Sequence, residues 1–291
     1  MDLLFDVIID TVIDGIKILP FLFVTYLLME LLEKHTMDKA GEIVKKAGAS
    51  GPLWGALLGV LPQCGFSAAA SNLYAGRVIT VGTLIAIYLS TSDEMLPLMI
   101  SDHVPLTTIL PIIGLKALVG IIAGFAVDFL ANKTRKLRNQ KKEDFRIDQM
   151  CQREHCHCDD EEEGSVVKSA FVHTVHILLY ILALTFILNL AVELIGEDTI
   201  KSVITANALI GHLVAGIIGL IPNCAASIII TELYLGGMIT IGTMMSGLLV
   251  GAGIGLLVLY RVNPEQRKNI HITGILYLTG VFFGILIDFI F

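Results

Sequence analysis

Long apolar runs alternate with short polar stretches along the whole chain. A transmembrane helix needs roughly 20 consecutive apolar residues, and six runs are long enough: 7–32, 78–100, 106–130, 166–195, 238–260 and 269–291. Continuous apolar runs of this length predict membrane-spanning helices rather than the amphipathic helices of a soluble domain. We therefore expect an all-α, polytopic membrane protein.

Two further apolar runs, 51–76 and 208–236, differ in character. Both are crowded with Gly, Ala and Ser, and each has a proline near its middle. Proline interrupts a helix, so each run is predicted to form two short half-helices joined by a break, as a re-entrant hairpin. With each hairpin limb counted separately, the sequence predicts ten helical segments.

The chain is internally repeated. When residues 51–83 are compared with 211–243, at an offset of 160, thirteen of 33 positions are identical without a gap. The sequence therefore predicts two homologous membrane repeats, at 1–131 and 165–291. A charged linker at 132–164 joins them.

Composition supports this class of protein. Apolar residues make up 55% of the chain and charged residues 16%, against roughly 25% charged in soluble domains. A soluble globule, a nucleic-acid-binding protein and a disordered chain all fit poorly. The net charge of −7 is concentrated, because residues 151–163 contain six acids and one arginine.

The distribution of basic residues predicts the topology. Lysine and arginine crowd residues 34–50, 133–142 and 261–268, whereas 93–103 has acidic residues only. Because basic loops stay inside, we expect the linker to be cytoplasmic and both termini outside, in a bacterial-type plasma membrane. Three spans and one hairpin per half then give an inverted-topology repeat.

The two hairpin tips, LPQCGFS and IPNCAAS, carry the candidate substrate site. Each brings a proline, an amide, a cysteine and a serine to the start of a helix: Pro62, Gln63, Cys64 and Ser67, and Pro222, Asn223, Cys224 and Ser227. Proline suits the first turn of a helix, whose free N–H groups attract anions and lower the pKa of a thiol. Alternatively, each cysteine only packs and each proline only breaks a helix; the repetition of the motif favours a site.

This set of groups indicates the class of substrate. Thiolates select soft metals and thiophilic metalloids, while helix N-termini favour anions or neutral oxyacids over bare cations. Together they suit an arsenite-like solute. The alternative is that the thiols only pack and the N–H groups bind a small organic or inorganic anion.

Ionisable residues within apolar runs are functional by default. The candidates for proton coupling are Asp10, Asp14, Glu232 and His173. An interfacial position would also explain the histidine, and Glu232 could lie at the outer surface. Lys116 sits in the middle of a span and needs a partner, whereas the repeat-related Asp128 and Asp288 are expected to make structural hydrogen bonds.

The linker contains a tract of soft ligands: Cys151, His155, Cys156, His157 and Cys158. Such cytosolic Cys/His tracts are typical of metal binding. The spacing matches no zinc-finger pattern, so transient, accessory metal capture is predicted rather than a resident cofactor. The alternative is an acidic linker in which these residues are incidental.

Several enzyme motifs are absent from the sequence. It has no Walker A motif, no G-x-S-x-G and no H-E-x-x-H, the signatures of ATP hydrolysis, serine hydrolases and zinc proteases. We therefore expect a secondary-active transporter and no enzyme.

The duplicated Pro-x-Cys hairpins, the ten-segment layout and the Cys/His-rich central loop resemble the ten-span heavy-metal exporter family. Members of that family are labelled arsenic efflux proteins or manganese transporters. The resemblance implies proton-driven efflux of a metal or metalloid. The alternatives are an anion permease, a divalent-cation (manganese) exporter and, with less support, a metal-sensing membrane protein. The expected partners are the metal or metalloid and the lipid bilayer, without nucleic acid; a homo-oligomer is compatible with the sequence.

Overall fold

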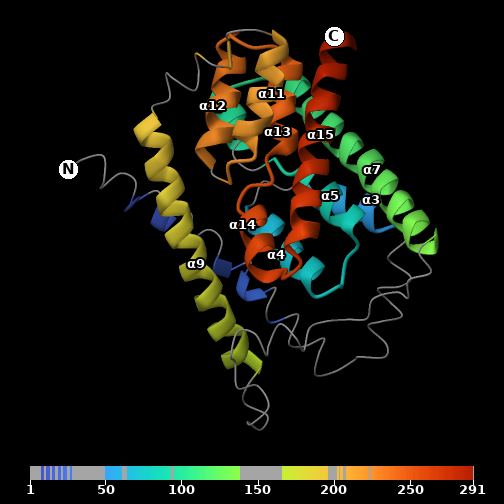
Figure 1. Cartoon of the computed structure of the whole chain (residues 1–291). Coiled ribbons are helices and arrows are strands. Elements are labelled where there is room, and N and C mark those ends of the chain that lie inside the picture. The colour runs from blue at the N-terminus through green and yellow to red at the C-terminus, as the bar shows by residue number, and fades with distance from the viewer. Residues whose placement is uncertain are drawn as a thin grey trace.

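The computed structural model describes individual positions between residues 8 and 27 and between 202 and 205. It also describes residues 50–60, 64–92, 95–137, 166–195, 208–222 and 224–290. Within these ranges the chain is helical, without strands (Figure 1). This confirms the all-α class.

The helices are α3 (Gly51–Gly59), α4 (Cys64–Ala75), α5 (Val81–Ser90), α6 (Met95–Ser101), α7 (Leu106–Leu137), α9 (Val166–Ile195), α11 (Ala208–Gly219), α12 (Cys224–Leu235), α13 (Ile241–Val250), α14 (Gly255–Val262) and α15 (Gln266–Ile290). Helices α7, α9 and α15 confirm three of the predicted spans, and each is long and apolar enough to cross a membrane. The described positions between 8 and 27 are also helical, but the rest of the predicted span 7–32 lies outside the described residues.

The span predicted over 238–260 is confirmed, because the stretch Ile241–Val262 is long and apolar enough to cross a membrane, but its helix is interrupted. Helix α13 ends at Val250 before α14 starts at Gly255, and in the predicted span 78–100 helix α5 likewise ends at Ser90 before α6 starts at Met95. In the first half the Thr91 hydroxyl donates to the carbonyl of Ile87 at 2.7 Å, which competes with continuation of the helix. In the second half Gly253 has a φ of 52°, a left-handed conformation that glycine adopts without steric cost.

The sequence repeat extends to the fold. Helices α12 and α13 have the bounds of α4 and α5 displaced by 160 residues, and α14 and α15 begin 160 residues after α6 and α7. The turn after α4 and the turn after α12 share a left-handed residue, Arg77 at φ 65° and Gly237 at φ 68°.

The TxGT motif caps a helix in each half. The hydroxyls of Thr80 and Thr240 accept from the backbone N–H groups three residues later, at 3.1 Å in both cases, which satisfies a donor at the helix start. The Asp128 carboxylate accepts from Gly82 N at 2.9 Å, and Asp288 accepts from Gly242 N at 2.7 Å. These bonds tie α7 to α5 and α15 to α13, which confirms the structural role expected for both aspartates.

The two halves also pack across one another. Helix α4 of the first half lies against α14 of the second, and α12 lies against α6. Helix α9 covers α4 and α14 from the other side, through a small apolar cluster. A buried network joins the halves, in which the Ser71 hydroxyl contacts the Tyr88 hydroxyl at 2.7 Å and donates to Gly255 O at 2.6 Å.

The surface of the bundle is apolar along its long helices. Leu110, Leu118 and Phe129 on α7, and Leu278 and Phe282 on α15, are all exposed. A large exposed apolar face marks a membrane or protein contact, so these side chains are placed to contact lipid. Between the helices, Arg77 in the turn after α4 pairs with Glu265 in the loop before α15 at 2.5 Å.

Candidate functional site

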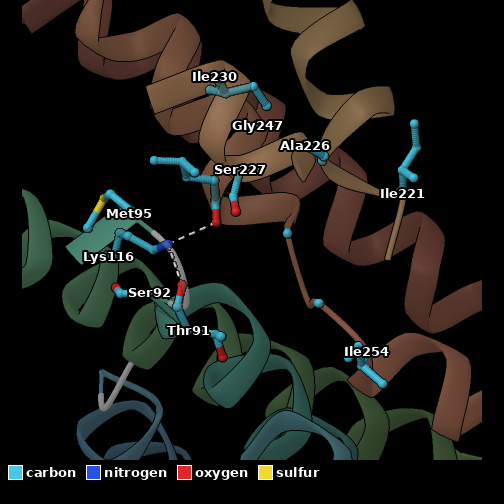
Figure 2. Close-up of a pocket in the computed structure, with 14 residues that line it drawn as sticks. Thr91, Ser92, Met95, Lys116, Ile221, Ala226, Ser227, Ile230, Gly247 and Ile254 are labelled. Carbon is cyan, nitrogen blue, oxygen red and sulfur yellow. Dashed lines mark hydrogen bonds between the residues drawn. The ribbon is translucent and has the colours of Figure 1, made fainter. Parts of the chain in front are cut away.

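A cavity of about 30 Å³ lies where the two broken helices meet the start of α12. It has room for roughly two water molecules. Figure 2 shows its lining, which comes from the ends of α5 and α13, from α7, and from the first turns of α12. The lining residues are Thr91, Ser92, Met95, Lys116, Gly219, Ile221, Ala226, Ser227, Ile230, Gly247, Leu248, Gly251, Gly253 and Ile254.

Lys116 supplies the charge among the described lining residues. It comes from the middle of α7 and is 1% exposed. Its ammonium donates to the carbonyl of Leu248 at 2.9 Å and to the carbonyl of Thr91 (Figure 2). Two partners of this lysine are therefore backbone groups, one from each half of the protein.

These two carbonyls belong to the ends of broken helices. Thr91 caps α5, and Leu248 lies in the last turn of α13. The last four carbonyls of a helix lack an intrahelical partner, and each helix C-terminus carries about half a negative charge. The ammonium therefore lies between two partial negative charges.

Lys116 has no equivalent in the second half. The position 160 residues later is Leu276, which is buried in the apolar core. The repeat thus places a cation at one of two related positions. A bare metal cation entering this cavity would meet the ammonium, whereas a neutral or anionic solute would meet a donor.

The prediction that both tip cysteines open a helix is confirmed, because α4 begins at Cys64 and α12 at Cys224. Their side chains lie outside the described part of the molecule, as do Pro62, Gln63 and Asn223. Pro222 is described and half-buried, two residues before α12 begins.

The two tip serines lie in different surroundings. Ser227 lines the cavity, beside Ala226 on the first turn of α12. Ser67 is buried on α4 and packs against α14, where the glycine at 255 leaves only 2.8 Å between an added Cβ and the backbone of Ser67. Of the two tips, the start of α12 therefore borders the cavity.

The candidates for proton coupling are scattered. Glu232 is on α12 and exposed, and His173 is on α9 with its side chain outside the described atoms. Asp10, Asp14 and the Cys/His tract at 151–158 lie outside the described residues. In the part of the chain that is described, no group of three His, Cys, Asp or Glu residues could hold a metal ion.

Sequence reasoning missed the contribution of the two helix breaks. The structure aligns Ser90, Thr91 and Ser92 with the glycine-rich break after α13. Equivalent helices therefore end at hydroxyl residues in the first half and at glycines in the second. The offset of 160 residues was the signal that could have revealed this equivalence.

A comparison with protein families gives one match. Residues 3–196, about two thirds of the chain, match the family described as "Putative, 10TM heavy-metal exporter". No curated protein and no solved structure matches the chain.

Proposed function

The chain belongs to this family of ten-span heavy-metal exporters, and on that premise we propose a secondary-active transporter that exports a soft metal or metalloid. The observation that carries the proposal is the cavity at the junction of the two broken helices. Irregular backbone at membrane depth is tolerated where it lines a cavity, and paired broken helices in two repeats are typical of a transporter's substrate site.

The proposed architecture is an inverted repeat with re-entrant hairpins. Cross-packing of α4 on α14 and of α12 on α6 supports it, because an inverted pair exchanges equivalent contacts between halves. The Arg77–Glu265 ion pair joins two loops that the positive-inside rule assigns to the cytoplasm. Rocking of one half against the other would then expose the cavity alternately to each side.

The substrate we propose is an uncharged, arsenite-like hydroxide. Cys224 opens α12, and Ser227, three residues later, lines the cavity; residues three apart share a helix face. A trivalent metalloid could exchange hydroxides for thiolates at the tips, while its remaining hydroxyl meets Ser227 and Lys116. Cys64 would contribute from the other tip.

Two observations bear on the alternatives. The buried ammonium of Lys116 favours a small anion more than it favours a bare divalent cation. A manganese site would need hard oxygen ligands, and the charge among the described lining residues is positive. The anion permease is therefore the second candidate function.

Replacement of both Cys64 and Cys224 by serine should abolish protection of a sensitised host against arsenite, antimonite and methylarsenite. Serine is too hard a ligand to replace a thiolate for these metalloids. The measurement is growth inhibition and cell-associated metalloid, at membrane expression matched to wild type, with zinc, cadmium and manganese in the same panel.

The control variant replaces Cys151, Cys156 and Cys158 by serine, which removes the thiols of the linker and leaves those of the tips in place. This variant should show weakened protection, but protection should not be abolished. Undiminished protection by the Cys64→Ser/Cys224→Ser variant would contradict a thiol site. If the wild type protects against no metal or metalloid, the anion permease replaces the exporter.

A further inference from the structure

His212 forms a second buried polar site, separate from the cavity lining. It lies on α11 and is 4% exposed. Its Nδ1 is 2.8 Å from the Ser246 hydroxyl on α13, and its Nε2 is 3.1 Å from Asp288 Oδ2 on α15. The imidazole thus joins three helices of the second half.

We propose that His212 binds the proton that is exchanged for substrate. The inference rests on the proposed exporter function and adds its coupling site. Histidine is the side chain that ordinarily changes charge between about pH 5 and 8. Among the described residues of α13 and α15, Asp288 is the ionisable group that contacts His212, and Ser246 is the uncharged polar group that contacts it.

The geometry accommodates both protonation states. A carboxylate only accepts hydrogen bonds, so Nε2–H donates to Asp288 in either state. Neutral imidazole accepts from the Ser246 hydroxyl through Nδ1; when Nδ1 gains a proton, the same hydroxyl turns and accepts. The site can therefore take up a proton without losing a partner.

The repeat argues against a purely structural role. Asp128 makes the same bonds to Thr80 and Gly82 that Asp288 makes to Thr240 and Gly242. At the positions equivalent to His212 and Ser246, however, the first half has a proline (residue 52) and an alanine (residue 86). The aspartate can therefore join its two helices without a histidine, and the histidine–serine pair is an addition to one half.

The site lies close to solvent on one side and close in sequence to the cavity lining on the other. The side chain of Asp288 is 22% exposed near the end of α15, whereas Nδ1, the nitrogen that takes up the proton, faces Ser246. Ser246 precedes Gly247 and Leu248, which line the cavity, and the carbonyl of Leu248 accepts from Lys116. A change of charge at His212 would thus be felt by the helix end that holds Lys116.

The test uses the full-length protein in proteoliposomes with arsenite as the probe. Two fluxes are compared: accumulation driven by a pH gradient, and counterflow of arsenite at equal pH. For His212→Gln we expect counterflow within about twofold of wild type and loss of the pH-driven component by at least about tenfold. Equal loss of both fluxes, or retention of pH-driven accumulation, would overturn the proposal.

Matched variants separate the proton site from the scaffold. Asp288→Asn should behave like His212→Gln, whereas Asp128→Asn, at the related position without a histidine, should keep both fluxes. Parallel loss of pH-driven flux in the two asparagine variants would overturn a role for the histidine pair. A wild type that moves no arsenite in either assay would instead refute the exporter itself.

Discussion

Replacement of Lys116 by methionine should reduce arsenite export by at least about tenfold while the protein still folds. Methionine fills nearly the same volume, so the main change is loss of the ammonium. The carbonyls of Thr91 and Leu248 then lose a donor inside the protein. Each carbonyl left unsatisfied costs about 1–3 kcal/mol of stability, whereas export should fall because the cavity loses the donor that a neutral or anionic solute would meet.

The selectivity of the variant should also change. Without the ammonium of Lys116, the two helix C-termini together expose about one negative charge to the cavity. We therefore expect Lys116→Met to lose discrimination against zinc and cadmium, measured as flux of each ion into proteoliposomes relative to arsenite. An unchanged ratio would show that Lys116 does not select the charge of the substrate.

The repeat supplies the control for this experiment. Leu276→Met introduces the same side chain at the equivalent position in the second half, where the native residue is already apolar. That variant should transport like wild type. Lys116→Arg should be intermediate, because it keeps the charge but places a larger planar group in a cavity of about 30 Å³. Identical transport by Lys116→Met and Leu276→Met would contradict the role assigned to the ammonium.

The sequence predicted the helices better than it predicted their breaks. Long apolar runs report which side chains avoid water, and four of the predicted spans followed from them directly. An apolar run does not report whether the helical hydrogen bonds of the backbone continue along its whole length. The helix breaks near Thr91 and Gly253 were therefore not predicted. Proline at the hairpin tips predicted a helix break. The breaks at hydroxyl residues and at glycines carried no comparable sequence signal, because both residue types also occur inside helices.

The candidate site was predictable in part for a similar reason. Ser227 and the helix start at Cys224 followed from a motif that occurs twice. Lys116 was recognisable as a buried charge, but its acceptors are backbone carbonyls, which every residue has. His212 stood in an ordinary apolar run, and only the position of α13 and α15 around it identifies its partners.

The two halves of the fold share some polar features and differ in others. The Thr80 and Thr240 caps, and the aspartates that bind beside them, occur in both halves and hold helices together. Lys116 and His212 are buried and ionisable and occur in one half each. The repeated scaffold forms without them, because leucine and proline occupy the equivalent positions 276 and 52.

Replacement of Gly242 by alanine should strongly destabilise the protein. A Cβ at this position would lie 2.3 Å from Gly284 O and 2.3 Å from Asp288 Oδ1. Both atoms are held in place, one as α15 backbone and the other by its bond to Gly242 N. Overpacking of this kind costs about 1–3 kcal/mol or more, in addition to displacement of the carboxylate.

Gly274 is the control, because nothing lies within 4 Å of a Cβ added there. It is on α15, so Gly274→Ala should be neutral or should stabilise by up to about 1 kcal/mol, the helix preference of alanine over glycine. The first half repeats the contrast, with Gly82 crowded by Gly124 O at 2.2 Å and Gly114 open. The measurement is the melting temperature and the monodisperse fraction in detergent for all four alanine variants. The contrast between a crowded and an open glycine appears twice in one chain. If alanine were poorly tolerated at every helical glycine, the melting temperature of all four variants would fall alike. If close approach of helices is the cause, only Gly82→Ala and Gly242→Ala should have a lower melting temperature.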